Sequence, residues 1–213
     1  MDEYVSYIVE QKILKTIDKI KKNNMNGYYA KSKDEVISIV KELLTDKATV
    51  AVGGSQTLFD TGVIDLLRSD SYTFYDRHQK NLSSSEIREI YTKSFSVDAY
   101  LCSTNAITEK GELVNMDGTG NRVAAMIYGP KKVIIIAGSN KIVKDIDEAN
   151  YRIRNWCAPI NGRRKNKTTP CAKVGQCFDC STDDRMCNNA TIIHKQRDKN
   201  RIHIILVNET LGY

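Results

Sequence analysis

The sequence predicts a three-layer α/β fold with a mostly parallel central sheet and helices on both faces. Residues 132–137 (KVIIIA) form a continuous apolar run rich in β-branched residues, which is typical of a strand buried on both faces of a parallel sheet. Residues 48–52 form a second such run and, like the first, lead directly to glycine. Helix-like and strand-like segments alternate along most of the chain, which favours helices layered around one sheet.

Helices are expected in the N-terminal region, residues 2–46. Apolar residues recur at helical spacing on a lysine-rich background over residues 2–24, which predicts one long amphipathic helix. A short extended piece is expected at residues 28–30. Residues 32–35 (SKDE) have the pattern of a capping box, so a second helix is predicted from there to about Thr45.

The middle of the chain is expected to alternate between helices and strands. Residues 56–68 are predicted to be helical with an interruption at Gly62. A second capping box at residues 83–86 predicts a helix that runs to about Ser94. Further strands are expected at residues 72–75 and 97–102, followed by a small hairpin at residues 106–108 and 112–115 and a short helical segment at residues 123–128.

Asp145 is expected to cap a helix that runs to Trp156 or Cys157 and stops before Pro159. Residues 161–190 are rich in Asn, Lys and Cys and have no periodicity, which predicts a Cys-rich loop. Two more strands are predicted at residues 191–194 and 202–207.

Length and composition favour one sizeable α/β domain spanning residues 1–213. Hydrophobic residues make up 41% of the chain. No apolar run approaches the roughly 18 residues that indicate a membrane span. The N-terminus is acidic and lacks the basic start and apolar core of a signal peptide. We therefore expect a soluble, cytoplasmic protein without a membrane partner.

The net charge of +6 is local to the C-terminal third of the chain. Residues 1–140 hold 18 basic and 18 acidic residues, whereas residues 141–213 hold 14 and 8. Base stacking needs aromatic side chains, and Phe178 is the single aromatic residue between Arg163 and Arg201. A nucleic-acid partner is therefore disfavoured.

Four of the six cysteines lie within seventeen residues, with a C-x-x-C step in the middle. Two thiolates can reach one metal from such a step, and two flanking cysteines complete four ligands. The spacing matches neither a zinc ribbon nor the common ferredoxin patterns, so the centre could be zinc or an iron–sulfur cluster, with a loop of free thiols as the alternative. The predicted ligands are Cys171, Cys177, Cys180 and Cys187. Cys102 and Cys157 are expected to be core thiols, with Cys157 an alternative ligand.

Ligands of parallel sheets bind at the carboxyl ends of the strands, where this sequence places glycines. The loop at residues 117–122 (DGTGNR) adds a carboxylate, a hydroxyl, an amide and a guanidinium, and the Arg122 fork could hold a phosphate or carboxylate. A structural turn capped by Asp117 is the alternative. Neither a Walker motif nor the dinucleotide glycine pattern is present, so no nucleotide cofactor is predicted. The candidate ligand-binding residues are Gly53, Gly54, Ser55, Asn105, Asp117, Gly118, Thr119, Gly120, Asn121, Arg122 and Gly138.

No catalytic triad or diagnostic pair of carboxylates is visible in the sequence. Glu109, Glu112 and Asp117 are the candidates for a nucleophile or base. The three histidines are isolated and receive no catalytic role, although His78 directly follows a predicted strand.

The sequence resembles the lactate-utilisation (LUD) domain family over nearly its whole length. The resemblance rests on residues 50–67 (VAVGGSQTLFDTGVIDLL), on residues 103–143, which include the DGTGNR loop, and on residues 169–193, which include all four clustered cysteines. It implies a fold similar to the NagB/RpiA/CoA-transferase-like proteins, which bind sugar phosphates, folates or acyl-CoA. It also implies iron–sulfur or flavin redox partner proteins in the oxidation of lactate to pyruvate. The family member that serves lactate utilisation itself lacks the four-cysteine loop, which suggests a metal centre particular to this branch.

Three functions remain in competition at this point. The first is a redox-linked subunit that binds a small anionic ligand and carries an iron–sulfur cluster. The second is an isomerase or transferase with a structural zinc, in which Glu109 or Glu112 acts as nucleophile or base. The third is a non-catalytic binding module. The chain could also form a homo-oligomer.

Overall fold

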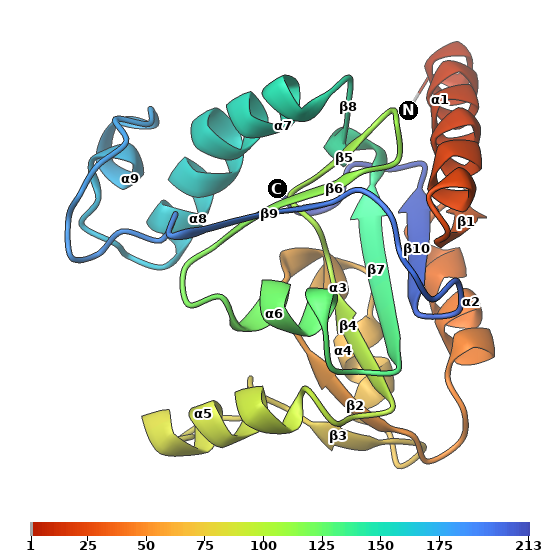
Figure 1. Cartoon of the computed structure of the whole chain (residues 1–213), viewed down its shortest axis with the longest axis horizontal. Coiled ribbons are helices and arrows are strands. Elements are labelled where there is room, and N and C mark those ends of the chain that lie inside the picture. Colours follow the sequence, from red (N-terminus) through yellow and green to blue (C-terminus); the bar gives the residue numbers. More distant parts are fainter. Residues whose placement is uncertain (1) are drawn as a thin grey trace.

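The computed structural model describes residues 2–213 and confirms the three-layer α/β fold (Figure 1). Its central sheet has six parallel strands in the order β1-β10-β7-β4-β2-β3. These are β1 (Asn26–Ala30), β2 (Thr49–Val52), β3 (Thr73–Tyr75), β4 (Ala99–Cys102), β7 (Lys132–Gly138) and β10 (Ile202–Val207). The predicted hairpin is part of a second sheet in the order β8-β5-β6-β9, formed by Ile142–Val143, Ala106–Thr108, Leu113–Asp117 and Asn189–Ile193.

The central strands are buried on both faces, as the apolar runs predicted. In β7, Val133 and Ile135 belong to the core on one face of the sheet, whereas Ile134 and Ile136 belong to the core on the other face. All four side chains are fully buried. Since successive side chains of a strand point to opposite faces, only a strand with no polar alternation fits between two cores.

Helices cover both faces of the central sheet. One face packs against α2 (Val36–Leu43), α3 (Gln56–Asp60) and α4 (Val63–Leu67). The other packs against α1 (Glu3–Lys22), α6 (Asn121–Ile127) and the second sheet. A third core joins the outer side of the second sheet to α7 (Ile146–Arg152). Figure 1 shows α7 at the opposite side of the molecule from α2.

Most of the predicted helix starts are confirmed. Ser83 and Glu86 form the full capping box at α5 (Ser84–Lys93), and Asp145 accepts a hydrogen bond from the Glu148 amide at α7. The box predicted at residues 32–35 was wrong in part: Ser32 caps a short 3₁₀ turn, but Glu35 accepts from the Lys31 amide. Over residues 2–213, no helix combines the length and apolar character that a membrane crossing requires.

The C-terminal region contains more helix than the sequence predicted. The helix that was expected to end near Trp156 passes through a π turn (Ile153–Cys157) into α8 (Ala158–Arg164). Pro159 is tolerated because it lies in the first turn of α8, just after the π turn has shifted the hydrogen-bond register. The segment predicted as one loop thus begins inside α8 and also contains α9 (Pro170–Val174). Figure 1 shows α8, α9 and the following loop together at one end of the molecule.

Candidate functional site

A cleft of about 760 Å³ opens at the carboxyl ends of the neighbouring strands β7, β4 and β2. Ser55 follows β2, Ser103 follows β4 and Lys141 follows β7, and all three line the cleft. The predicted glycine-rich loop lines it too, together with residues of α8 and the Cys-rich loop. The structure therefore brings Ser55 and Arg122 to one cavity, as expected for a site at the strand ends.

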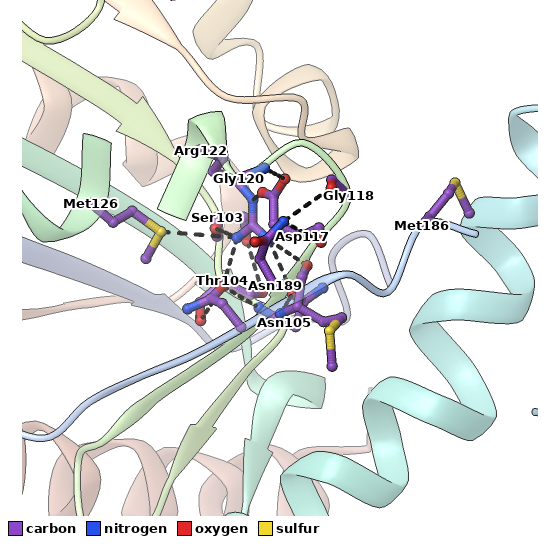
Figure 2. Close-up of polar contacts among 12 residues, drawn as sticks. Ser103, Thr104, Asn105, Asp117, Gly118, Gly120, Arg122, Met126, Met186 and Asn189 are labelled. Carbon is purple, nitrogen blue, oxygen red and sulfur yellow. Dashed lines mark hydrogen bonds and ion pairs between the residues drawn. The ribbon is translucent and has the colours of Figure 1, made fainter. Parts of the chain in front are cut away.

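Arg122 fastens the glycine-rich loop to the end of β4 (Figure 2). Its Nε donates to Asp117 at 3.1 Å, Nη1 donates to the Ser103 carbonyl and Asn115, and Nη2 donates to Asn105 and the Met116 carbonyl. A guanidinium has five N–H donors, so protein acceptors occupy all of them. Arg122 is therefore placed to order the cleft wall, and the ligand-holding role predicted for its fork stays a prediction.

Gly53 lies where the Arg122 side chain passes closest to the backbone. A Cβ atom at this position would lie 3.0 Å from the Tyr100 hydroxyl and 3.1 Å from Cγ and Cδ of Arg122. We expect Gly53→Ala to lower the free energy of unfolding by about 1–2 kcal/mol, because the buried neighbours must shift. Gly54→Ala is the matched control, since its nearest neighbour would lie at 3.9 Å. Urea unfolding of both variants checks this, and equal stabilities would contradict it.

Lys141 lies at the floor of the cleft and is 2% exposed. Its amine donates to the Thr57 hydroxyl at 3.0 Å and to the Ser103 hydroxyl at 2.9 Å, and it has no carboxylate partner among residues 2–213. Burial, with a further contribution from Arg152, lowers the pKa of Lys141 to about 7. A large fraction of this lysine is therefore neutral at physiological pH.

Cations without a carboxylate partner line much of the cleft. Seven basic side chains face three acidic ones there, and three of the seven are paired with acids: Arg122 with Asp117, Lys167 with Asp184, and Arg185 with Asp179. The remaining four, within the described part of the chain, are Arg77, Lys141, Arg164 and Lys165. A surplus of unpaired positive charge in a concave site favours an anionic ligand.

Two buried polar atoms on the cleft wall lack a partner in the described chain. They are Nε2 of His78 and the hydroxyl of Tyr213. Burial and the neighbouring Arg77 lower the pKa of His78, so its ring is neutral near pH 7. A buried polar atom without a hydrogen bond is costly, so both atoms would gain from a partner, but neither is exposed to the cleft as the wall stands.

The four clustered cysteines line a second, smaller cavity beside the cleft. Burial raises the pKa of Cys187, and the neighbouring Cys171, Cys177 and Cys180 raise it further, so the four sulfurs act on one another. Even so, no three His, Cys, Asp or Glu side chains in residues 2–213 are arranged to hold one metal ion. The thiols therefore converge without forming a ready single-ion site.

Arg185 organises the loop that carries these cysteines. Its guanidinium donates to the carbonyls of Cys180 and Cys187 and to the Asp179 carboxylate. Two of the sulfurs accept hydrogen bonds from the loop, Cys177 from the Asp179 amide and Cys180 from the Thr182 hydroxyl. The loop is thus held by contacts that leave the sulfurs facing the cavity.

The other predicted site residues line the cleft, support its wall or lie outside it. Gly54, Asn105, Asp117, Gly118, Thr119 and Asn121 line the cleft, whereas Gly53 and Gly120 support its wall and Gly138 lies outside it. A Cβ at Gly138 would lie 2.5 Å from the Glu209 carbonyl, so this glycine makes room for the C-terminal segment. Glu109 pairs with Lys12 and Glu112 with His194, and neither glutamate lines the cleft.

Sequence reasoning missed several cleft residues. Lys141, Arg77 and Tyr213 had no motif around them. Cys157 was expected to be a core thiol or an alternative metal ligand, and its place in the lining of the cleft was not predicted. A signal was present for Lys141, because it follows the apolar run of β7 at the same edge as the glycines.

Comparison with known proteins identifies the family of the chain. A sequence model of the LUD domain matches residues 13–207. The crystal structure of a DUF162 family protein from Deinococcus radiodurans is similar over 93% of this chain and 98% of that chain, with a TM-score of 0.54 and 12% identity, which shows the fold alone. Ribose 5-phosphate isomerase from Plasmodium falciparum overlaps 53% of each chain with a TM-score of 0.33 and 16% identity, too little to support an argument. No curated protein matches the sequence.

Proposed function

The chain belongs to the LUD domain family, and on this premise we propose a redox-linked function: it binds a small organic anion in the cleft, beside an iron–sulfur centre held by the four-cysteine loop. One observation carries the proposal. The cleft and the cysteine cavity share a wall formed by Met116, Ile153, Ala158, Arg185, Met186 and Cys187. A ligand in the cleft would therefore lie close to the thiols, of which Cys187 itself lines the cleft.

The cleft suits a small anion for electrostatic and geometric reasons. Its unpaired cations attract negative charge, and charge interactions beside the buried Lys141 are less screened by water than those at the protein surface. A carboxylate or phosphate can bind these cations, and further polar groups on the ligand can bind the polar side chains that line the cleft.

The cysteine loop suits an iron–sulfur cluster better than a single zinc ion. Four thiolates can bind either centre. A zinc ion needs all four sulfurs around one point, and the described residues form no such group. A cluster lets each thiolate bind its own iron, so it does not require the four sulfurs to meet around one point. When bound, such a centre supplies one-electron transfer.

The chain's own residues would shape the properties of this centre. Phe178, Met186 and Ile153 line the cavity and limit the access of water to the sulfurs. The hydrogen bonds to Cys177 and Cys180 would help to fix the positions of these two sulfurs as ligands. Arg185, which is paired with Asp179, would hold the loop around the centre through its hydrogen bonds to the Cys180 and Cys187 carbonyls.

Loss of iron from cysteine variants tests the proposed centre. We expect Cys177→Ala and Cys180→Ala to lose most of their iron and their brown absorption after anaerobic purification, because each removes one of four ligands. Cys102→Ala is the control, since Cys102 is fully buried in the sheet core and lines neither cavity. Iron retained at the level of the control in both loop variants would argue against the centre.

Titration with anions tests the proposed cleft. We expect pyruvate, lactate or inorganic phosphate to bind, and Lys165→Met to weaken binding about tenfold, which corresponds to about 1.4 kcal/mol for one charge-assisted contact. Lys195→Met is the control, because Lys195 is an exposed lysine outside the cleft. Isothermal titration calorimetry measures both. Equal affinities in the two variants would count against an anion site in the cleft.

A further inference from the structure

The amine of Lys141 lies at the floor of the cleft, without a carboxylate partner in the described chain. We propose that Lys141 forms a covalent imine with the carbonyl group of a small 2-oxo acid bound in the cleft. This inference rests on the proposed function, because it assumes that the anion site receives an organic acid. It adds a substrate class and a reacting residue to that site.

The position of Lys141 is fixed by three neighbouring strand ends. The lysine ends the 3₁₀ turn Ser139–Lys141 that follows β7, Thr57 lies on α3 after β2, and Ser103 follows β4. The two hydroxyls hold the amine at 3.0 Å and 2.9 Å from their oxygens. An amine held in this way on rigid elements does not swing into solvent, as an exposed lysine does.

The hydrogen bonds leave the amine able to attack a carbonyl carbon. Ser103 donates its own proton to the Thr104 carbonyl at 3.4 Å, so its oxygen accepts from Lys141. A neutral amine that donates two N–H groups to the two hydroxyls keeps its lone pair free. The neutral form is accessible because burial and the nearby Arg152 and Arg122 disfavour the ammonium, as the lowered pKa of Lys141 indicates.

The charges around the cleft favour a carbonyl compound that also carries a carboxylate group. Arg77, Arg164 and Lys165 line the same cleft without carboxylate partners in the described chain and can bind a carboxylate. A 2-oxo acid carries its carboxylate on the carbon next to the carbonyl. The cations of the cleft wall can therefore bind the carboxylate while the Lys141 amine faces the carbonyl. A hydroxy acid offers the same charge but no electrophilic carbon.

The reaction balances without an external oxidant or reductant. The Lys141 nitrogen forms a bond to the carbonyl carbon, the amine loses its two protons to the departing oxygen, and one water molecule leaves. The product is an imine, and its protonated form withdraws electrons from the adjacent carbon. Borohydride reduces this imine by adding hydride to the carbon, which leaves a stable secondary amine on the lysine.

Reductive trapping tests the proposal on the full-length protein. Wild-type protein is incubated with glyoxylate, pyruvate or 2-oxoglutarate and sodium borohydride, and its peptides are mapped by mass spectrometry. We expect one of the three acids to modify Lys141 stoichiometrically, and an excess of lactate to compete with it. Lys141→Met is expected to lose the adduct, whereas Lys195→Met, at an exposed lysine outside the cleft, keeps it.

The outcomes separate this proposal from the function proposed above. Lactate cannot form an imine, so lactate binding measured by calorimetry reports on the cleft alone. Lactate binding without trapping at Lys141 by any of the three acids overturns the imine and leaves the anion site standing. An adduct spread over exposed lysines, with Lys141 no more modified than they are, overturns it as well. An absence of both binding and trapping overturns both proposals.

Discussion

Arg122→Met is expected to destabilise the protein by about 3–5 kcal/mol, because the largely buried Asp117 carboxylate loses its ion-pair partner. The side chains of both members of this ion pair are 11% exposed. The substitution also removes one hydrogen bond from each side-chain oxygen of Asn115 and Asn105, although other donors still reach both oxygens. Equilibrium urea unfolding measures the change.

Two further variants show whether this effect belongs to the ion pair. The double variant Arg122→Met with Asp117→Asn should recover part of the loss, because it removes the unpaired charge. Arg201→Met is the matched control for a structural arginine outside the cleft, since Arg201 donates to the carbonyls of Ala125, Met126 and Pro130. Arg201→Met should lower the stability without weakening anion binding, whereas Arg122→Met should lower the stability and weaken anion binding. A stable Arg122→Met protein would show that the loop does not depend on this guanidinium.

Lys141→Met is expected to change how stability depends on pH. The folded-state pKa of Lys141 is about 7, against an ordinary value of 10.5, so between these values the unfolded state binds more protons than the folded state. The wild type therefore carries a penalty that is complete at and below about pH 7 and disappears as the pH rises toward 10.5. Removing the amine removes this penalty.

The comparison of variant with wild type isolates this effect from other titrations. The stability of Lys141→Met relative to the wild type should fall by about 3 kcal/mol between pH 7 and pH 10. The charged or titratable groups near enough to change the pKa of Lys141 are Arg152, Cys157, Arg122 and Asp60. Chemical unfolding at a series of pH values measures the difference. A difference that stays constant over this range would mean that Lys141 keeps an ordinary pKa.

The fold could be predicted because its determinants are local in the sequence. Residues 132–137 are apolar at every position after the first, and this pattern has few solutions other than a doubly covered strand. The box at Ser83 formed because its helix continues without interruption, whereas a 3₁₀ turn intervened at Ser32. The helical segment continues past Pro159 because a π turn precedes this residue, and no pattern in the sequence predicted that turn.

The site could be predicted only in part because its determinants are tertiary. The loop of residues 117–122 was found from its glycines, yet the acceptors that occupy Arg122 come from other segments, such as Ser103 and Asn105. Lys141 differs from the other lysines because it is buried, and the residues next to it in the sequence do not indicate that burial. The four cysteines were visible as a cluster, but their shared wall with the cleft forms only where β6, the π turn, α8 and the loop meet.

The iron, zinc and acid-labile sulfide content of the wild-type protein, purified without oxygen, tests the central claim most directly. A redox site beside the cleft predicts iron and sulfide in equal amounts, close to one cluster per chain, with little zinc. One zinc per chain without sulfide would make the loop a structural element and contradict the redox function. Protein that holds neither metal, even after reconstitution with iron and sulfide, would contradict a centre at these four cysteines altogether.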